Sequence, residues 1–151
     1  MSDVVTIARL THSLPEGLAA LTAESEQAGW GFLRRLTDEW AVRLNRFSGP
    51  GEALFAAWTN GQLAGVCGLN MDTYAGDSRV GRVRHLYVGA EYRCRGIGRQ
   101  LVQAVVESAR GRFRLLRLRT ENAEAAAFYE RLAFQRQVNI PECTHILEIA
   151  A

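Results

Sequence analysis

The sequence contains no lysine, because all 18 of its basic residues are arginine. It has only three cysteines, far apart in the chain, which form neither a disulfide framework nor a zinc-binding pattern. It also lacks an apolar run long enough to cross a membrane, and its N-terminus has no basic segment followed by an apolar one. We therefore expect a protein of the reducing cytoplasm, with no metal site and no membrane partner.

The charge balance argues against a general nucleic-acid binder. The net charge is only +2 at neutral pH, whereas such binders carry a strongly basic face. Eleven of the arginines nevertheless fall between Arg79 and Arg119, and the planar guanidinium group is suited to phosphate. With 151 residues, 48% of them hydrophobic, the chain is expected to form a single domain over residues 1–151.

Hydrophobic periodicity predicts strands and helices that alternate through the middle of the chain. The pair Asn60-Gly61 between two apolar segments is typical of a β-hairpin, and Leu116 and Leu118 alternate with arginines as in a strand with one covered face. The predicted strands cover 4–10, 53–58, 63–69, 80–88, 115–119 and 144–149, and the predicted helices lie within 14–29, 32–43, 98–110 and 123–132. This order favours a mixed α/β sheet.

The most informative stretch runs from Arg84 to Leu101, where a strand, a turn and a helix follow one another. Gly96 and Gly98 allow a tight turn and a close approach of the backbone to a ligand. The helix that follows offers unpaired N–H groups and the positive end of its dipole, which together favour phosphate. Three arginines surround this turn: Arg93, Arg95 and Arg99. A tight turn with solvated arginines is the alternative interpretation of the same residues.

The turn is neither of the two common nucleotide loops, since Leu101 stands where a dinucleotide fingerprint has its third glycine and no Gly-Lys-Ser/Thr run exists. The remaining pattern, Arg-x-x-Gly-x-Gly after a strand, resembles the pyrophosphate-binding motif of the GNAT superfamily of acetyl-CoA-dependent N-acetyltransferases. A second segment, Asn122-x-x-Ala125-x-x-Phe128-Tyr129, resembles the motif of that family's fourth helix. Ala133 stands where the family usually has glycine before Phe134, which suggests a modestly altered helix end.

This resemblance implies a GNAT acyl-CoA N-acyltransferase fold, with a central, mostly antiparallel mixed sheet of six to seven strands and about four helices. It implies transfer of the acetyl group of acetyl-CoA to an unidentified primary amine acceptor by direct attack in a ternary complex. Tyr129 would protonate the departing thiolate, and an N–H group of Leu86 or Tyr87 would hold the thioester carbonyl. The residues assigned to the cosubstrate are Leu86, Tyr87, Val88, Arg93, Cys94, Arg95, Gly96, Ile97, Gly98, Arg99, Asn122 and Phe128.

The general base and the acceptor stay open. Some family members use a glutamate on the fifth strand, but Arg117 occupies that position here. His85 is the first candidate because histidine titrates near neutrality, and His145, Glu91 or a chain of waters are alternatives. We favour a small-molecule acceptor, with a protein amine as the alternative, and a homodimer is possible. A catalytically silent acyl-CoA sensor, or an arginine-faced protein that binds RNA or another acidic partner, are the competing hypotheses.

Overall fold

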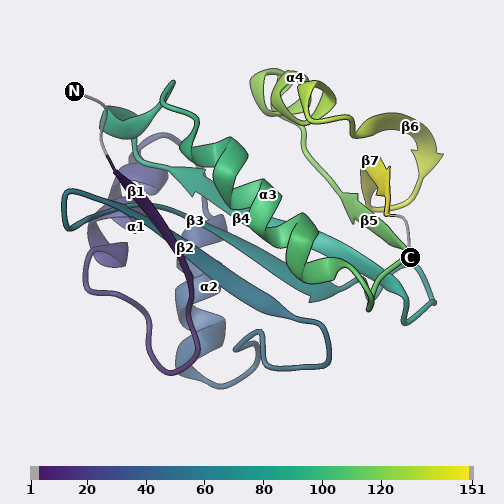
Figure 1. The fold of residues 1–151 in the computed structure, drawn as a ribbon, viewed down its shortest axis with the longest axis horizontal. Helices are drawn as coiled ribbons and strands as arrows, with labels where there is room; N and C mark the ends of the chain where they lie inside the picture. The colour runs from purple at the N-terminus through teal and green to yellow at the C-terminus, as the bar shows by residue number, and fades with distance from the viewer. Residues whose placement is uncertain (1–3, 150–151) are drawn as a thin grey trace.

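The computed structural model describes residues 4–149, which form a seven-stranded sheet with helices on both faces (Figure 1). The strands are β1 (Val5–Arg9), β2 (Ala53–Thr59), β3 (Gln62–Met71), β4 (Val80–Val88), β5 (Leu115–Leu118), β6 (Gln135–Ile140) and β7 (Cys143–Glu148), in the order β1-β2-β3-β4-β5-β7-β6. The pair β4–β5 is parallel and the other pairs are antiparallel. The predicted mixed, mostly antiparallel sheet is confirmed.

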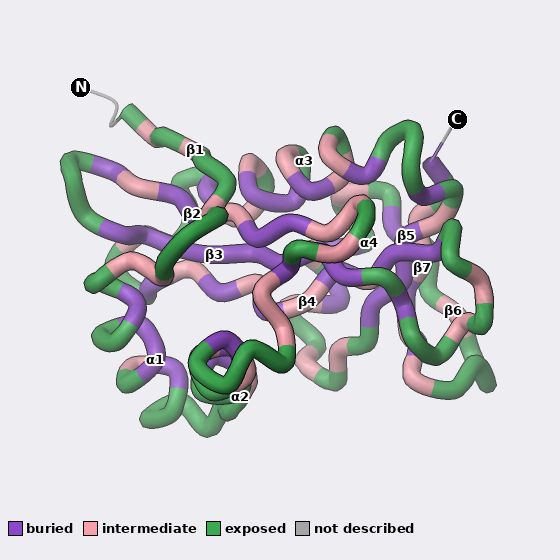
Figure 2. The backbone as a smooth tube through the Cα atoms, turned by 90° about the horizontal axis from the view of Figure 1, so that it is seen from below, coloured by how far each residue is buried: buried purple, intermediate pink, exposed green. Residues whose placement is uncertain are grey.

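The helices divide the hydrophobic core into two layers. They are α1 (Leu18–Gln27), α2 (Phe32–Ala41), α3 (Ile97–Ala109) and α4 (Ala123–Arg131), with a short 3-10 turn, η1, at Ala90–Tyr92. Helix α3 buries Leu101 and Val105 against one face of the sheet, and α2 buries Leu33 and Leu36 against the other. Figure 2 shows the buried segments of the sheet lying between α3 and the pair α1 and α2.

Strand β4 contains a β-bulge at the centre of the sheet. Val66 pairs with Tyr87 and Gly68 pairs with Arg84, so Cys67 of β3 faces two residues of β4, His85 and Leu86. The extra residue is accommodated because His85 takes a left-handed conformation with φ of 61°. The bulge reorients the end of β4. The side chains before it and those after it therefore do not follow one continuous alternation between the two faces of the sheet.

Strands β4 and β5 pair only at their beginnings and then diverge (Figure 1). Their register covers Val80 to Arg82 on β4, so the rest of β4 has a partner on the β3 side alone. The N–H of Gly89 donates to Ala64 of β3, and strand alternation therefore directs the N–H groups of Leu86 and Val88 towards the gap. Within residues 4–149, these N–H groups thus have no partner strand at the centre of the fold.

Strand β6 is the element that the sequence does not predict. Five of its six residues are exposed and its pairing with β7 is irregular, so it shows neither an apolar alternation nor a buried run. Among residues 4–149, no helix is long and apolar enough to span a membrane.

Candidate active site

The glycine turn between β4 and α3 has the geometry of an anion site. Gly96 is the N-cap of α3 with φ of 78°, and Cys94 is also left-handed with φ of 63°. No heavy atom lies within 4 Å of a Cβ built on Gly96, and no side chain caps the helix. Its first N–H groups are therefore available to an anion from solvent.

The three arginines of the turn are not equivalent. Arg95 and Arg99 are exposed around the start of α3. Arg93 turns back on the protein: its Nε donates to the carbonyl of Val88 at 3.0 Å, and its guanidinium lies 5.4 Å from the centre of the Tyr87 ring. Arg93 therefore anchors the end of β4 in this structure, whereas the other two remain on the open side of the turn.

Tyr87 and Leu86 point in different directions. The Tyr87 backbone pairs with Val66, and its hydroxyl makes a short hydrogen bond to the carboxylate of Glu24 on α1. Burial and that hydrogen bond raise the pKa of Tyr87 to about 12. Of the two N–H groups predicted to hold a thioester carbonyl, only that of Leu86 faces the gap between β4 and β5.

Tyr129 lies beside the bulge. It is buried on α4, with the rings of Phe128 and Phe134 edge-on at 5.2 and 5.3 Å. Burial raises its pKa well above the ordinary value of a tyrosine, and the nearby Cys67 adds to this effect. Because Cys67 is the residue opposite the bulge, the structure brings Tyr129 and the Leu86 region together from segments more than forty positions apart.

Asn122 holds α4 at its N-terminus. Its side-chain oxygen accepts a hydrogen bond from the N–H of Ala125 at 2.9 Å, which is the capping bond expected of asparagine. The Asn122 N–H donates to the hydroxyl of Thr120 after β5. Asn122 therefore orders the connection between β5 and the helix that carries Tyr129.

His85 is buried at the bulge between two phenylalanines. Its ring lies 6.4 Å from that of Phe32 and 6.1 Å from that of Phe47, and neither ring nitrogen has a hydrogen-bond partner among residues 4–149. Burial lowers its pKa to about 3, the charge of Arg84 adds to this, and the backbone of Phe32 offsets only part of it. His85 is therefore neutral at pH 7 and a weak proton acceptor.

The alternative bases are occupied or remote from this environment. His145 is fully buried on β7, with its Nε2 2.8 Å from the carboxylate of Glu130 and its Nδ1 2.9 Å from the hydroxyl of Thr144. Glu91 lies exposed on η1. Arg117 is buried against Asp72 and donates to the carbonyl of Pro141 at 3.0 Å, so it has a structural role at the base position.

A cavity of about 530 Å³ opens on the α2 face below the divergence of β4 and β5. It is lined by charged side chains of α2, β4 and the turn between β6 and β7, among them Arg35, Glu39, Arg82, Arg84 and Glu142. Sequence reasoning missed this cavity. The available signal was the alternation of Arg82 and Arg84 along an otherwise apolar strand.

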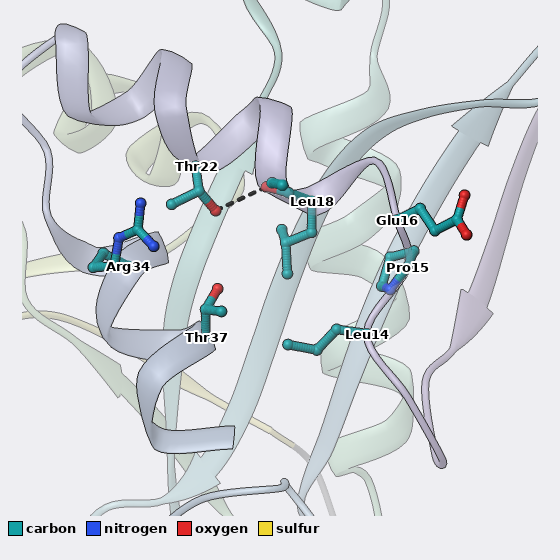
Figure 3. Close-up of a pocket in the computed structure, with 8 residues that line it drawn as sticks. Leu14, Pro15, Glu16, Leu18, Thr22, Arg34 and Thr37 are labelled. Carbon is teal, nitrogen blue, oxygen red and sulfur yellow. Dashed lines mark hydrogen bonds between the residues drawn. The ribbon is translucent and has the colours of Figure 1, made fainter. Parts of the chain in front are cut away.

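A smaller hollow of about 210 Å³ lies between α1 and α2 (Figure 3). Leu14, Pro15 and Leu18 face Thr37 and Arg34 across it, and the Thr22 hydroxyl donates to the Leu18 carbonyl. No residue of β4 or α4 lines it. The larger cavity, in contrast, reaches β4 up to Arg84, the residue before the bulge.

Known proteins share both this fold and this sequence pattern. The model of the acetyltransferase (GNAT) family matches residues 18–134. The N-alpha-acetyltransferase RimI of Mycobacterium tuberculosis is 33% identical over 144 residues, which cover 89% of this chain and 81% of RimI. A crystal structure assigned to an acetyltransferase of Exiguobacterium sp. 255-15 superposes with a TM-score of 0.84 at 32% identity, covering 96% of this chain and 93% of the other.

A GCN5-related N-acetyltransferase from Kribbella flavida shares the fold, with a TM-score of 0.70 at 22% identity and coverage of 94% and 95% of the two chains. The splayed parallel pair, the bulge and the glycine turn thus belong to an acyltransferase architecture. The chain is a member of the GNAT family of N-acetyltransferases. The predicted family, fold and enzyme class are confirmed.

Proposed function

We propose that this protein moves the acetyl group of acetyl-CoA to a primary amine of a small molecule by direct attack in a ternary complex. The observation that supports the proposal is the end of β4 at Leu86 and Val88, which has no partner strand on the β5 side among residues 4–149 and leads to the open N-terminus of α3. An amide-containing pantetheine arm fits such an edge as an added strand does. The pyrophosphate then reaches the turn at Cys94–Arg99, with Arg95 and Arg99 beside it.

In the proposed step, the amine nitrogen attacks the thioester carbonyl carbon. The carbonyl oxygen accepts a hydrogen bond from the N–H of Leu86. The C–S bond breaks, and the thiolate of CoA takes the proton of the Tyr129 hydroxyl. The proton that the attacking nitrogen loses on becoming an amide then restores the Tyr129 hydroxyl by way of solvent. The raised pKa of Tyr129 keeps it protonated at neutral pH. Burial in the same apolar surroundings also raises the pKa of the CoA thiol. The difference between the pKa values of the phenol and the thiol therefore stays small enough for the proton transfer.

The attacking amine must first lose a proton, which costs about 4–5 kcal/mol for an alkylamine at neutral pH. His85 and a water of the α2-face cavity are our two candidate acceptors. The pKa of His85, about 3, makes it a poor acceptor of an ammonium proton, so we favour a route through water to bulk solvent. Positioning of both substrates supplies most of the remaining acceleration.

A second candidate acceptor is the α-amine of a protein. The observation that favours it is the 33% identity to a protein named as an N-alpha-acetyltransferase. An intact-protein or peptide substrate would need the rim of the cavity, where Leu44 and Tyr74 are exposed, as its binding surface. A homodimer, absence of nucleic-acid binding and a cytoplasmic location remain predictions.

Calorimetry of acetyl-CoA binding with a matched pair of variants tests the proposal. Gly96 and Gly111 both have positive φ, 78° and 82°, and open space around a built Cβ, but only Gly96 lies at the N-terminus of α3. We expect Gly96→Asp to weaken acetyl-CoA binding by more than about tenfold, because it places a carboxylate where phosphate binds. Gly111→Asp carries the same backbone strain and is expected to bind normally.

Two outcomes contradict the proposal. Equal acetyl-CoA affinity of the two variants would mean that the phosphates do not bind at the turn. Normal binding of acetyl-CoA with no acetylation of any amine, in a broad acceptor screen, would favour the silent sensor.

A further inference from the structure

The α2-face cavity contains a half-buried arginine without an acidic partner. Arg84 makes a single long hydrogen bond, from Nη1 to the side-chain oxygen of Asn70 at 3.3 Å. No carboxylate within residues 4–149 lies within ion-pair distance of it. A guanidinium withdrawn from water without a counter-ion is unfavourable, and this is the condition that a bound anion relieves.

Two neighbouring arginines of the cavity, Arg82 on β4 and Arg119 directly after β5, are already paired with carboxylates. Arg82 lies 3.2 Å from Asp72 and donates to the carbonyl of Glu142 at 2.7 Å. Arg119 contacts Glu142 at 2.8 Å and Glu121 at 2.7 Å. Arg84 therefore differs from both of these neighbours.

Arg35 of α2 is a second arginine without an ion pair in the described part of the chain, and it lines the same cavity. Desolvation lowers the pKa of Arg84, and the charges of Arg82 and Arg35 lower it further, against the opposing effect of Glu39. Two guanidinium groups thus repel each other across a cavity, an arrangement that an anion between them would stabilise.

The glutamates of the cavity limit the charge of that anion. Glu39, Glu52 and Glu142 line the same space, so a phosphate dianion would meet strong repulsion. A carboxylate carries a single charge and matches the planar fork of arginine with two parallel hydrogen bonds. The chemistry of the lining therefore favours a carboxylate.

Arg84 also lies close to the reacting atoms of the proposed step. It precedes Leu86 by two residues, with the bulge at His85 between them, so the two Cα atoms are at most about 7 Å apart. We infer that the acceptor of this enzyme is a small amino carboxylate, whose carboxylate binds Arg84 with help from Arg35 while its amine reaches the thioester at Leu86. This inference rests on the proposed acetyl transfer and names its substrate class.

An acceptor panel of matched pairs tests it. Free amino acids and ω-amino carboxylates are each compared with their carboxamides, and the acetylated product is quantified by mass spectrometry. We expect the carboxylate member of the preferred pair to have a kcat/KM about tenfold or more above its carboxamide. The Arg84→Gln variant should lose this preference while its rate with carboxamides and its affinity for acetyl-CoA stay the same.

Two further variants check whether the effect of Arg84→Gln is specific to the cavity. Arg110→Gln removes an exposed arginine of the α3 C-terminus that pairs with Glu107, and it should keep the wild-type preference. Arg35→Gln changes an exposed residue, so it tests the site even where Arg84→Gln fails to fold, and it should reduce the preference by about threefold or more. Equal rates with carboxylate and carboxamide in the wild type, or equal losses on both in Arg84→Gln, would overturn the inference.

The outcomes separate the two proposals. Acetylation of amines or peptide N-termini without regard to a carboxylate would uphold acetyl transfer and reject the amino carboxylate. Failure to bind acetyl-CoA would reject both.

Discussion

The ring of Phe128 packs directly on Gly98: a Cβ built on the glycine would lie 3.3 Å from Cζ of the ring. Gly98 belongs to the first turn of α3 and Phe128 to α4, so this contact joins the two motifs that are thirty residues apart in sequence. It fixes α4 relative to the anion turn. The neighbouring Tyr129 is thereby directed to the bulge of β4.

Removing the Tyr129 hydroxyl tests the acid. We expect Tyr129→Phe to lower kcat by about a hundredfold, the usual contribution of general acid catalysis, with little change in acetyl-CoA affinity. The aromatic contacts with Phe128 and Phe134 are retained, so the fold should persist. Steady-state kinetics beside a Tyr92→Phe control on η1 provide the measurement. Unaltered turnover in Tyr129→Phe would remove the acid assignment.

Thiol labelling tests the location of the cosubstrate. Cys94 is exposed in the anion turn, whereas Cys67 and Cys143 are buried and the pKa of Cys67 is raised to about 12 by burial. We expect iodoacetamide to modify Cys94 alone in the folded protein, and saturating CoA to slow that reaction because its pyrophosphate covers the turn. Peptide mass spectrometry reports both. Labelling of Cys94 at the same rate with and without CoA would place the pyrophosphate elsewhere.

The buried His85 should make stability depend on pH. Its pKa falls from 6.5 to about 3 on folding, so the unfolded state binds more protons between these values. Stability is therefore full above about pH 6.5 and falls by as much as about 1.4 kcal/mol per pH unit as the pH drops towards 3. His85→Asn, which tolerates the positive φ, should flatten this dependence in urea titrations.

The same variant addresses catalysis. If kcat/KM keeps its pH profile in His85→Asn, a water accepts the amine proton. Loss of an acidic limb near pH 6.5 from the pH profile of kcat, which reports the enzyme–substrate complex, would instead show that substrate binding restores a basic His85.

Asp72 should be a strong determinant of stability. Its side chain is fully buried, lies 3.2 Å from Arg82 and 3.6 Å from Arg117, and accepts the N–H groups of Tyr74 and Ala75. We expect Asp72→Ala to lower the free energy of unfolding by about 3–5 kcal/mol, since it leaves two arginines unpaired.

The exposed pair Glu107–Arg110 is the control for Asp72. Its separation is similar, 3.0 Å, but its side chains are 75% and 47% exposed. Glu107→Ala should cost less than about 1 kcal/mol in the same denaturant titration. Equal losses in the two variants would mean that burial does not strengthen the Asp72 network.

The sequence predicts the parts of this molecule that depend on local pattern. The anion turn needs glycine for its left-handed backbone, and the Asn122 cap and the apolar helix faces follow short-range rules. Strand β6 is not predicted from the sequence because an exposed edge strand lacks a regular alternation of apolar and polar residues. Alternation likewise suggests a solvated Arg117, but Asp72, forty-five residues earlier, neutralises it in the interior.

The candidate site is predictable only in its cosubstrate half. The bulge, the burial of His85 and the α2-face cavity arise where β3, β4 and α2 meet, and no single segment contains them. From the sequence, His85 is expected to be a strand residue that titrates near neutrality. In the fold, Phe32 and Phe47 pack around its ring. Long-range packing therefore decides the acceptor half.

The short pairing of β4 with β5 divides the sheet into two leaves, β1–β4 and β5–β7, joined by a seam from Val80 to Arg82. The first leaf carries α1, α2 and α3, while α4 lies with the second, so the anion turn and the phenol of Tyr129 sit on opposite leaves. The contact of Phe128 with Gly98 joins the two leaves at the open end of the gap, where the cosubstrate of our proposal would contact both. In the proposed mechanism, the distance between the acid and the thioester therefore depends on this contact and on the bound cosubstrate together.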